Sequence, residues 1–144
     1  MPTNAPLQGM AYAEYKQWIS RFWPKMTYPT QSEASGPIDI SSSATANTKG
    51  SYVQAIASTS FAWTHIVLTA SSTAATKKVS IYIATGGAGS EVEKVKKLGL
   101  YTIAGGIETT HSFPFTVAAG TRVSCACEDT AGSGSATVWV TGLG

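Results

Sequence analysis

Lys78-Val-Ser-Ile-Tyr-Ile-Ala84 and the Gly86-Gly-Ala-Gly-Ser-Glu91 run that follows it decide the fold of this chain. Branched apolar residues alternate with polar or small ones in the first segment, which is the two-residue period of a β-strand covered on one face. The glycine run predicts a sharp turn with backbone angles that only glycine tolerates, in which Ser90 or Glu91 bonds the loose amides. The centre of the chain is therefore predicted to be sheet, not helix.

Strand-like runs recur at short intervals on both sides of this stretch. They cover residues 51–58, 61–70, 76–84, 98–103, 111–117, 121–128 and 135–141. Short strands separated by Gly, Ser, Thr and Ala turns are typical of a β-sandwich or barrel. Only 12% of the 144 residues are charged, a composition that also favours strands and turns over surface helices. These patterns predict one all-β domain.

The run 61–70 is apolar on both of its faces. Alternation places Trp63 with Val67 on one face, and it places Ile66 with Leu68 on the other. A strand of this kind is either central in its sheet or covered by another chain.

Two further runs predict local irregularities. Pro114 cannot donate a ladder hydrogen bond, so its strand should lie at a sheet edge or be bulged there. Residues 91–98 carry apolar side chains at every third position. We interpret them as a strand with a bulge, and a short helical turn is the alternative.

The charge balance and the cysteines exclude several classes of protein. Ten basic and eight acidic residues give a net charge of +2, which requires neither a nucleic acid nor an anionic membrane as partner. We expect no signal peptide and no membrane span, because no window approaches about 18 continuous apolar residues. Cys125 and Cys127 lie two positions apart in a strand-like run, and we interpret them as small buried thiols. A metal site would need further ligands that the sequence does not offer.

Residues 1–48 differ from the rest of the chain. From 10 to 23, apolar residues recur at spacings of three and four, which predicts an amphipathic helix that ends at the following proline. Residues 25–48 read as a polar linker with only a hint of a strand at 37–40. We therefore divide the chain into an N-terminal arm, helix and linker (1–48) and a β-sandwich domain (49–144).

The aromatic face of the predicted helix is too large to stay in water. Aromatic side chains near an arginine, here Arg21, are enriched where interfaces concentrate their binding energy. The alternative is that the helix packs on its own sandwich, and the residues alone leave both options open. The candidate partner-binding residues are Tyr15, Trp18, Ile19, Phe22 and Trp23.

No nucleotide or nucleophile motif occurs in the chain. The glycines at 86–89 lack the Lys-Ser/Thr of a phosphate-binding loop, and no Gly-x-Ser-x-Gly elbow is present. His65 and His111 have no sequence cue that ties either of them to a serine or a carboxylate.

The charged pairs and the lysine cluster suggest no chemistry either. Neighbouring carboxylates such as Glu91 with Glu93 read as solvated charge, because adjacency cannot show the facing pair that a glycosidase needs. The lysines at 94–97 form a basic cluster that is too small for nucleic-acid binding. We therefore predict no catalytic, cofactor-binding or metal-binding residues, no cofactor and no enzymatic activity.

Two strings carry a family resemblance. They are Val79-Ser-Ile-Tyr-Ile-Ala-Thr-Gly-Gly-Ala-Gly-Ser-Glu91 and Phe113-Pro-Phe-Thr-Val-Ala-Ala-Gly-Thr-Arg-Val-Ser124. Together they resemble small β-sandwich modules of tailed-bacteriophage virions, in which a strand leads into a Gly-Gly-x-Gly-Ser-Glu loop and a later hairpin turns through Pro-x-x-x-x-x-Gly-Thr-Arg. The likeness covers roughly residues 51–141. It implies a jelly-roll-like antiparallel β-sandwich and a non-enzymatic virion structural role, as a capsid decoration (cement) protein or as a fibre or tail-tip module.

Of these roles, chain size favours a capsid decoration protein, because the chain has no coiled-coil or collagen-like run to serve as a fibre shaft. The resemblance then implies a homotrimer on the capsid surface, assembled in the host cytoplasm. Its arm would bind the major capsid protein or other virion proteins, and neither a nucleic acid nor a membrane is expected as partner. The alternative is a tail or fibre module that binds host-surface glycans through exposed aromatics such as Tyr82, Tyr101 or Trp139.

Overall fold

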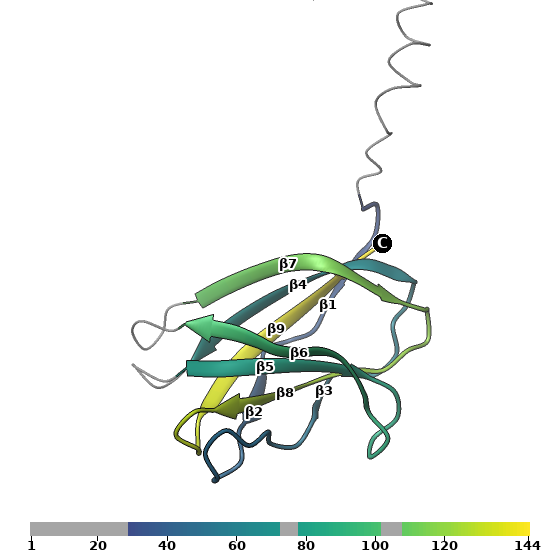
Figure 1. Cartoon of the computed structure of the whole chain (residues 1–144). Helices are drawn as coiled ribbons and strands as arrows, with labels where there is room; N and C mark the ends of the chain where they lie inside the picture. The colour runs from purple at the N-terminus through teal and green to yellow at the C-terminus, as the bar shows by residue number, and fades with distance from the viewer. Residues whose placement is uncertain (1–28, 73–77, 102–107) are drawn as a thin grey trace, which may run out of the picture.

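The computed structural model describes residues 29–72, 78–101 and 108–144, which form two packed β-sheets (Figure 1). The five-stranded sheet contains β1 (Ser32–Ala34), β2 (Ile38–Ser41), β4 (Trp63–Ser72), β7 (Glu108–Val117) and β9 (Ser135–Leu143). The four-stranded sheet contains β3 (Val53–Ile56), β5 (Lys78–Thr85), β6 (Val92–Tyr101) and β8 (Val123–Asp129). The fold is all-β, as the alternating pattern predicts.

The strand order is that of a jelly roll. The larger sheet runs β1-β9-β4-β7 with β2 also paired to β9, and the smaller sheet runs β3-β8-β5-β6. Every strand pair is antiparallel. From β2 to β9 the two orders are therefore 2-9-4-7 and 3-8-5-6, the interleaved arrangement of a double-sheet jelly roll. This confirms the predicted fold class.

The core lies between the sheets and is built from alternate residues of the facing strands. Trp63 is its largest fully buried side chain, and the strictly alternating β9 sends every second residue inward. Cys125 and Cys127 are buried free thiols, as predicted. Each fully buried branched side chain contributes about 1.5–3 kcal/mol to folding. The buried core residues are Ile40, Trp63, Ile66, Leu68, Ala70, Val79, Ile81, Ile83, Phe115, Val117, Val123, Cys125, Cys127, Ala136, Val138 and Val140.

Strand β4 is central in its sheet, between β9 and β7, which agrees with its apolar sequence. The predicted grouping of its side chains is wrong, however, because Trp63 points into the core together with Ile66 and Leu68. The ladder with β7 shifts register between Trp63 and His65. One extra residue at such a bulge reverses the alternation on one side of it.

Strand β6 explains the three-residue spacing of residues 91–98. Ile81 pairs with Leu98 and Ile83 pairs with Val95, so two residues of β5 oppose three of β6. A bulge of this kind brings Val95 and Leu98 to the same face, and both pack against the core. The interpretation as a strand with a bulge is confirmed.

Pro114 lies on β7, which is an edge strand of the five-stranded sheet. It pairs with His65 at the register shift of the β4–β7 ladder, so both parts of the prediction hold. An edge strand keeps one side free of ladder bonds, and there the missing amide hydrogen costs nothing.

Residues 32–41 belong to the sandwich, although their polar sequence reads as an arm and linker. β1 and β2 pair in turn with the two halves of β9, and Ile40 is fully buried in the core. Ser35 bridges the interruption between the two strands, since its hydroxyl accepts a hydrogen bond from the Val140 amide at 2.9 Å. The predicted helix at 10–23 lies outside the described residues.

Candidate functional site

The five predicted partner-binding residues, Tyr15, Trp18, Ile19, Phe22 and Trp23, also lie outside the described part of the chain. Their role therefore stays a prediction. The described residues show instead what surrounds the point where this segment joins the sandwich. The amides of Thr30 and Gln31 both donate to the Gly144 carbonyl, at 2.8 and 3.0 Å. The arm consequently meets the domain at the end of β9.

The two histidines lie on neighbouring strands but on opposite faces of the sheet. His65 is exposed on the outer face of β4, where its ring nitrogen lies 3.0 Å from the Thr64 hydroxyl. His111 sits on the inward-facing side of β7, and its Nε2 is buried without a hydrogen-bond partner. Because the sheet separates them, they cannot form a joint acid–base pair.

The two strings that carry the family resemblance meet in space. Arg122 belongs to the second string, and its Nη1 donates to Glu91 Oε1 at 3.0 Å and to the Gly86 carbonyl at 3.1 Å. Gly86 and Gly89 have positive φ angles of 109° and 79°, as the glycine run predicts. Hydrogen bonds from its own amide and from the Arg122 guanidinium keep the pKa of Glu91 below its usual value. The residues of the two strings therefore hold together the β5–β6 turn, with Arg122 bonded to both of its ends, which is a structural arrangement.

A polar cluster, which we call the outer cluster, covers the outer face of the four-stranded sheet. It comprises Lys49, Tyr52, Tyr82, Glu93 and Glu128. The Tyr82 hydroxyl donates to Glu128 at 2.5 Å, and the Tyr52 hydroxyl donates to Glu93 at 2.9 Å. Lys49 forms an ion pair with Glu93 and lies 4.5 Å from the centre of the Tyr52 ring. Tyr82 is only 6% exposed, so the expectation that it is an exposed glycan-binding aromatic is wrong.

The electrostatics of the outer cluster favour a structural role. Hydrogen bonds from Lys49 and Tyr52 lower the pKa of Glu93 to about 2. Burial opposes the charged form of Lys49, but its bonds to Glu93 and Tyr52 outweigh this and raise its pKa. Burial, together with the bond to Glu128, raises the pKa of Tyr82. A general acid or base needs a pKa near the working pH, and these shifts move each group away from neutrality.

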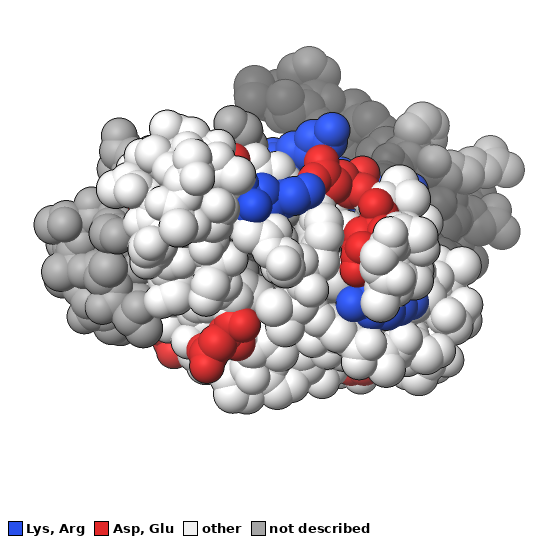
Figure 2. All heavy atoms as spheres, turned by 90° about the horizontal axis from the view of Figure 1, so that it is seen from below, with Lys and Arg blue, Asp and Glu red and all other residues white. Residues whose placement is uncertain are grey.

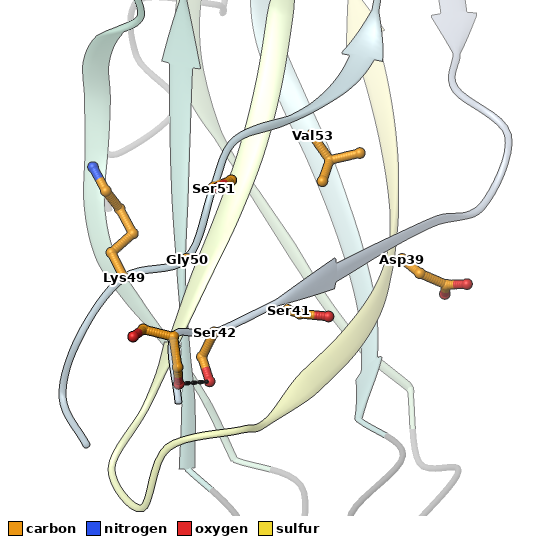
Figure 3. A pocket seen from close by; sticks show the side chains of 8 residues that line it. Asp39, Ser41, Ser42, Lys49, Gly50, Ser51 and Val53 are labelled. Atoms are coloured by element: carbon orange, nitrogen blue, oxygen red, sulfur yellow. Dashed lines mark hydrogen bonds between the residues drawn. The ribbon is translucent and has the colours of Figure 1, made fainter. Parts of the chain in front are cut away.

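A shallow polar groove opens between the edge strands β2 and β3, with a volume of about 520 Å³ (Figure 3). Asp39 and Lys49 stand at its opposite ends with their side chains pointing away from each other. Asp39 accepts a hydrogen bond from Thr137 at 2.6 Å, and Lys49 belongs to the outer cluster. Most of the remaining lining is small and polar. The lining residues are Asp39, Ser41, Ser42, Ser43, Lys49, Gly50, Ser51 and Val53.

The outer face of the five-stranded sheet contains a continuous area without Asp, Glu, Lys or Arg. We call this area the uncharged face, and it consists of three cross-strand rows centred on His65, Val67 and Thr69 of β4. The next row, centred on Ser71, ends at Glu108 and so closes the area at one side. The partners of the three central residues on β7 and β9 are, in order, Pro114 and Leu143, Ser112 and Thr141, and Thr110 and Trp139.

Several charged side chains elsewhere on the described part of the molecule form ion pairs. Figure 2 shows one face on which acidic and basic side chains lie beside each other in a band, while most of the surface around them is uncharged. Glu93 contacts Lys96 at 3.3 Å in addition to Lys49, so part of the basic cluster at 94–97 is neutralised by its own strand. A solvated, paired set of charges offers no continuous basic track for a nucleic acid.

Within the described residues, no group of three or more His, Cys, Asp or Glu side chains is arranged to hold a metal ion. The same residues contain no helix that is long and apolar enough to cross a membrane. Sequence reasoning identified neither the outer cluster nor the uncharged face. Each is assembled from strands far apart in the chain, and no local motif marks either one.

Comparisons with known proteins reveal a distant likeness in shape. No protein-family model and no curated protein matches the chain. Among solved structures, the chain is similar to a chain of the infectious bursal disease virus Gx strain, with 13% identity and a TM-score of 0.41. It is also similar to the D431N mutant VP2 protein of infectious bursal disease virus in derived T=1 particles, with 11% identity and a TM-score of 0.41. These likenesses cover 83% of this chain but only 40% and 38% of the viral chains.

Proposed function

We propose that this chain is a non-enzymatic virion structural protein, a capsid decoration protein that binds the head shell through its N-terminal arm. One observation carries the proposal. The jelly-roll domain commits Glu91 and Glu93 to ion pairs and Glu128 to a hydrogen bond with Tyr82, whereas the sequence predicts an aromatic amphipathic segment at 10–23 ahead of it. A stable, chemically inert domain with an attached adhesive segment suits an add-on part of a shell.

The root of the arm supports the same role. Glu33 of β1 accepts hydrogen bonds from the Trp63 indole at 2.5 Å and from the Ser60 hydroxyl at 2.7 Å. β1 is therefore tied to the largest buried side chain of the core. An arm that holds the domain on a particle needs such a fixed root. If the root were not fixed, attachment would also have to order it, and the entropy lost in doing so would weaken binding.

The test measures attachment of Trp18→Ala and Phe22→Ala to purified heads of the virus that encodes the protein. An interface aromatic is worth about 2 kcal/mol or more, so each variant should bind the heads roughly 30-fold more weakly. Gln17→Ala is the matched control, because it shortens a side chain on the polar side of the same predicted helix. All three proteins should share the urea midpoint of the unaltered chain. Variants that unfold the domain and still attach would contradict the proposal.

The second candidate function is a tail or fibre module that binds host-surface glycans. The groove between β2 and β3 favours it, because small hydroxyl-bearing side chains can bond a polyol. Trp139 on the outer face is only partly buried and keeps the aromatic part of this hypothesis open. Binding to shed host polysaccharide that disappears in Trp139→Ala or Ser41→Ala, while attachment to heads is absent, would establish this function in place of the first.

A further inference from the structure

The uncharged face has the properties of a docking surface. The central row places Val67 beside Thr141, and the adjacent row places Thr69 beside Trp139. The hydroxyls of Thr69 and Thr110 lie 3.0 Å apart and form a hydrogen bond with each other, so a docked partner need not replace that bond. Removing charged groups from water is costly when an interface forms, and covering this area removes none. Trp139, half-buried among threonines, provides an aromatic anchor.

The arm joins the domain at the border of this face. The row centred on His65 includes Leu143, and the next residue, Gly144, receives the amides of Thr30 and Gln31. β1 runs antiparallel to β9, so residues 29–31, which precede β1, run past the end of β9. The aromatic segment is thus tethered within reach of an uncharged face.

The dimensions of segment and face agree. A helix over residues 10–23 would be about 21 Å long at 1.5 Å per residue. Three cross-strand rows, two residues apart along each strand, span roughly 14–20 Å with their side chains. Both surfaces are aromatic or aliphatic at their centre and free of opposing charge. Each can therefore bury the apolar area that the other leaves exposed.

We propose that the uncharged face binds the aromatic segment 10–23 of a second copy of this chain. The proposal goes beyond the function proposed above, because it names a second partner for the arm besides the head shell. Direction favours the second copy: residues 29–31 run past Gly144 at the end of β9, so a return to the chain's own face would require the spacer of residues 24–28 to reverse the chain. Pro24 and Pro29 bracket the spacer, and the residue before each proline avoids helical geometry, so the spacer favours extension rather than a return.

The first test replaces Trp18 with photoreactive benzoylphenylalanine in an isotopically labelled full-length copy, mixed with an equal amount of unlabelled copy. After irradiation, mass spectrometry should find labelled arm peptides joined to unlabelled peptides of β4 or β9. Crosslinks confined to a single copy would overturn the proposal, because the arm would then cover its own face. Crosslinks to another part of the sandwich would overturn it as well. This experiment changes no residue of the face and so does not depend on its tolerance to substitution.

The second test measures the mass of the full-length protein in solution by light scattering. The unaltered chain should have a multiple of its 15.0 kDa mass. Val67→Lys puts a charge at the centre of the face and should return the mass to that of one chain. Ser71→Lys, four positions along on the same side of β4 and outside the face, should leave the assembly intact. Equal masses for both variants would refute the docking site.

Attachment of the same proteins to heads is measured separately, so that failure of the docking proposal can be distinguished from failure of the decoration role. A monomeric Val67→Lys protein that still attaches leaves the decoration role intact, and it shows that copy-to-copy docking is a distinct function of the face. An assembled, crosslinkable protein that never attaches refutes the decoration role and leaves the docking proposal standing.

Discussion

Gly142 of β9 packs against the Trp63 ring, and filling the space between them is a direct test of this fold. A Cβ added to Gly142 would lie 1.9 Å from Cε2 and 2.1 Å from Cδ2 of the Trp63 ring. Real Cβ atoms essentially never approach another heavy atom within 3.0 Å. Gly142→Ala therefore forces either the indole or the backbone of β9 to move.

The size of the effect follows from how firmly the indole is held. Trp63 is fully buried, and its Nε1 donates to Glu33 at 2.5 Å, so the ring cannot move into solvent without losing that bond. Overpacking of a core typically costs 1–3 kcal/mol, and a rigid neighbour places this case near the upper limit, about 3 kcal/mol. For a domain of this size, that loss lowers the melting temperature by roughly 6–12 °C.

A double-mutant cycle isolates the contact. Trp63→Phe replaces the indole that the added methyl meets with a smaller ring, so Gly142→Ala should cost less in that background, with a coupling energy of about 1 kcal/mol or more. Urea unfolding followed by far-UV circular dichroism measures all four proteins, because tryptophan fluorescence changes with the substitution itself. A cost below about 0.5 kcal/mol for Gly142→Ala alone, or an equal cost in both backgrounds, would show that the two residues do not pack as described.

The remaining predictions concern charge, thiols and the hairpin. Because the pKa of Glu93 is lowered to about 2 from 4.5, its contribution to stability is complete above pH 4.5 and is lost as the pH falls towards 2. Glu93→Gln should flatten the pH dependence of the unfolding free energy in that window, and an unchanged slope would exclude the ion pair with Lys49. Burial raises the pKa of Cys125 to about 12, and burial together with Asp129 raises that of Cys127 to about 11. Neither thiol should react with a thiol reagent at pH 8 until the chain is unfolded in urea. Arg122→Met should destabilise the domain by about 1–2 kcal/mol and speed hydrogen exchange at the amides of 86–91, whereas exchange there at the unaltered rate would argue against the Arg122 clasp.

Local patterns predicted those features that depend on neighbouring residues. Alternation located the strands after residue 50, and the three-residue spacing of Val95 and Leu98 indicated a bulge in β6. Features that depend on distant residues were missed. Tyr82 reads as the exposed side of a strand, and its burial follows from Glu128, 46 positions away, and from the outer cluster around it. The bulge beside His65 in β4 belongs to a pairing with β7, so the sequence of β4 alone could not place Trp63 on the inner face.

The same distinction explains why residues 32–41 read as arm and linker in the sequence but pair with β9 in the structure. Apart from Ile38 and Ile40, residues 32–41 are mostly polar or small, and they form strands because they pair with the edge of β9. Since the hydrogen bonds of an antiparallel pair lie across the strands, a pull along the arm is shared by the whole β1–β9 ladder. The ladder passes that pull to Trp63 through Glu33 and to β4 through the long β4–β9 pairing. An arm rooted at the C-terminal end of a central strand can bear load without peeling away from its own domain, and this property suits the decoration role proposed above.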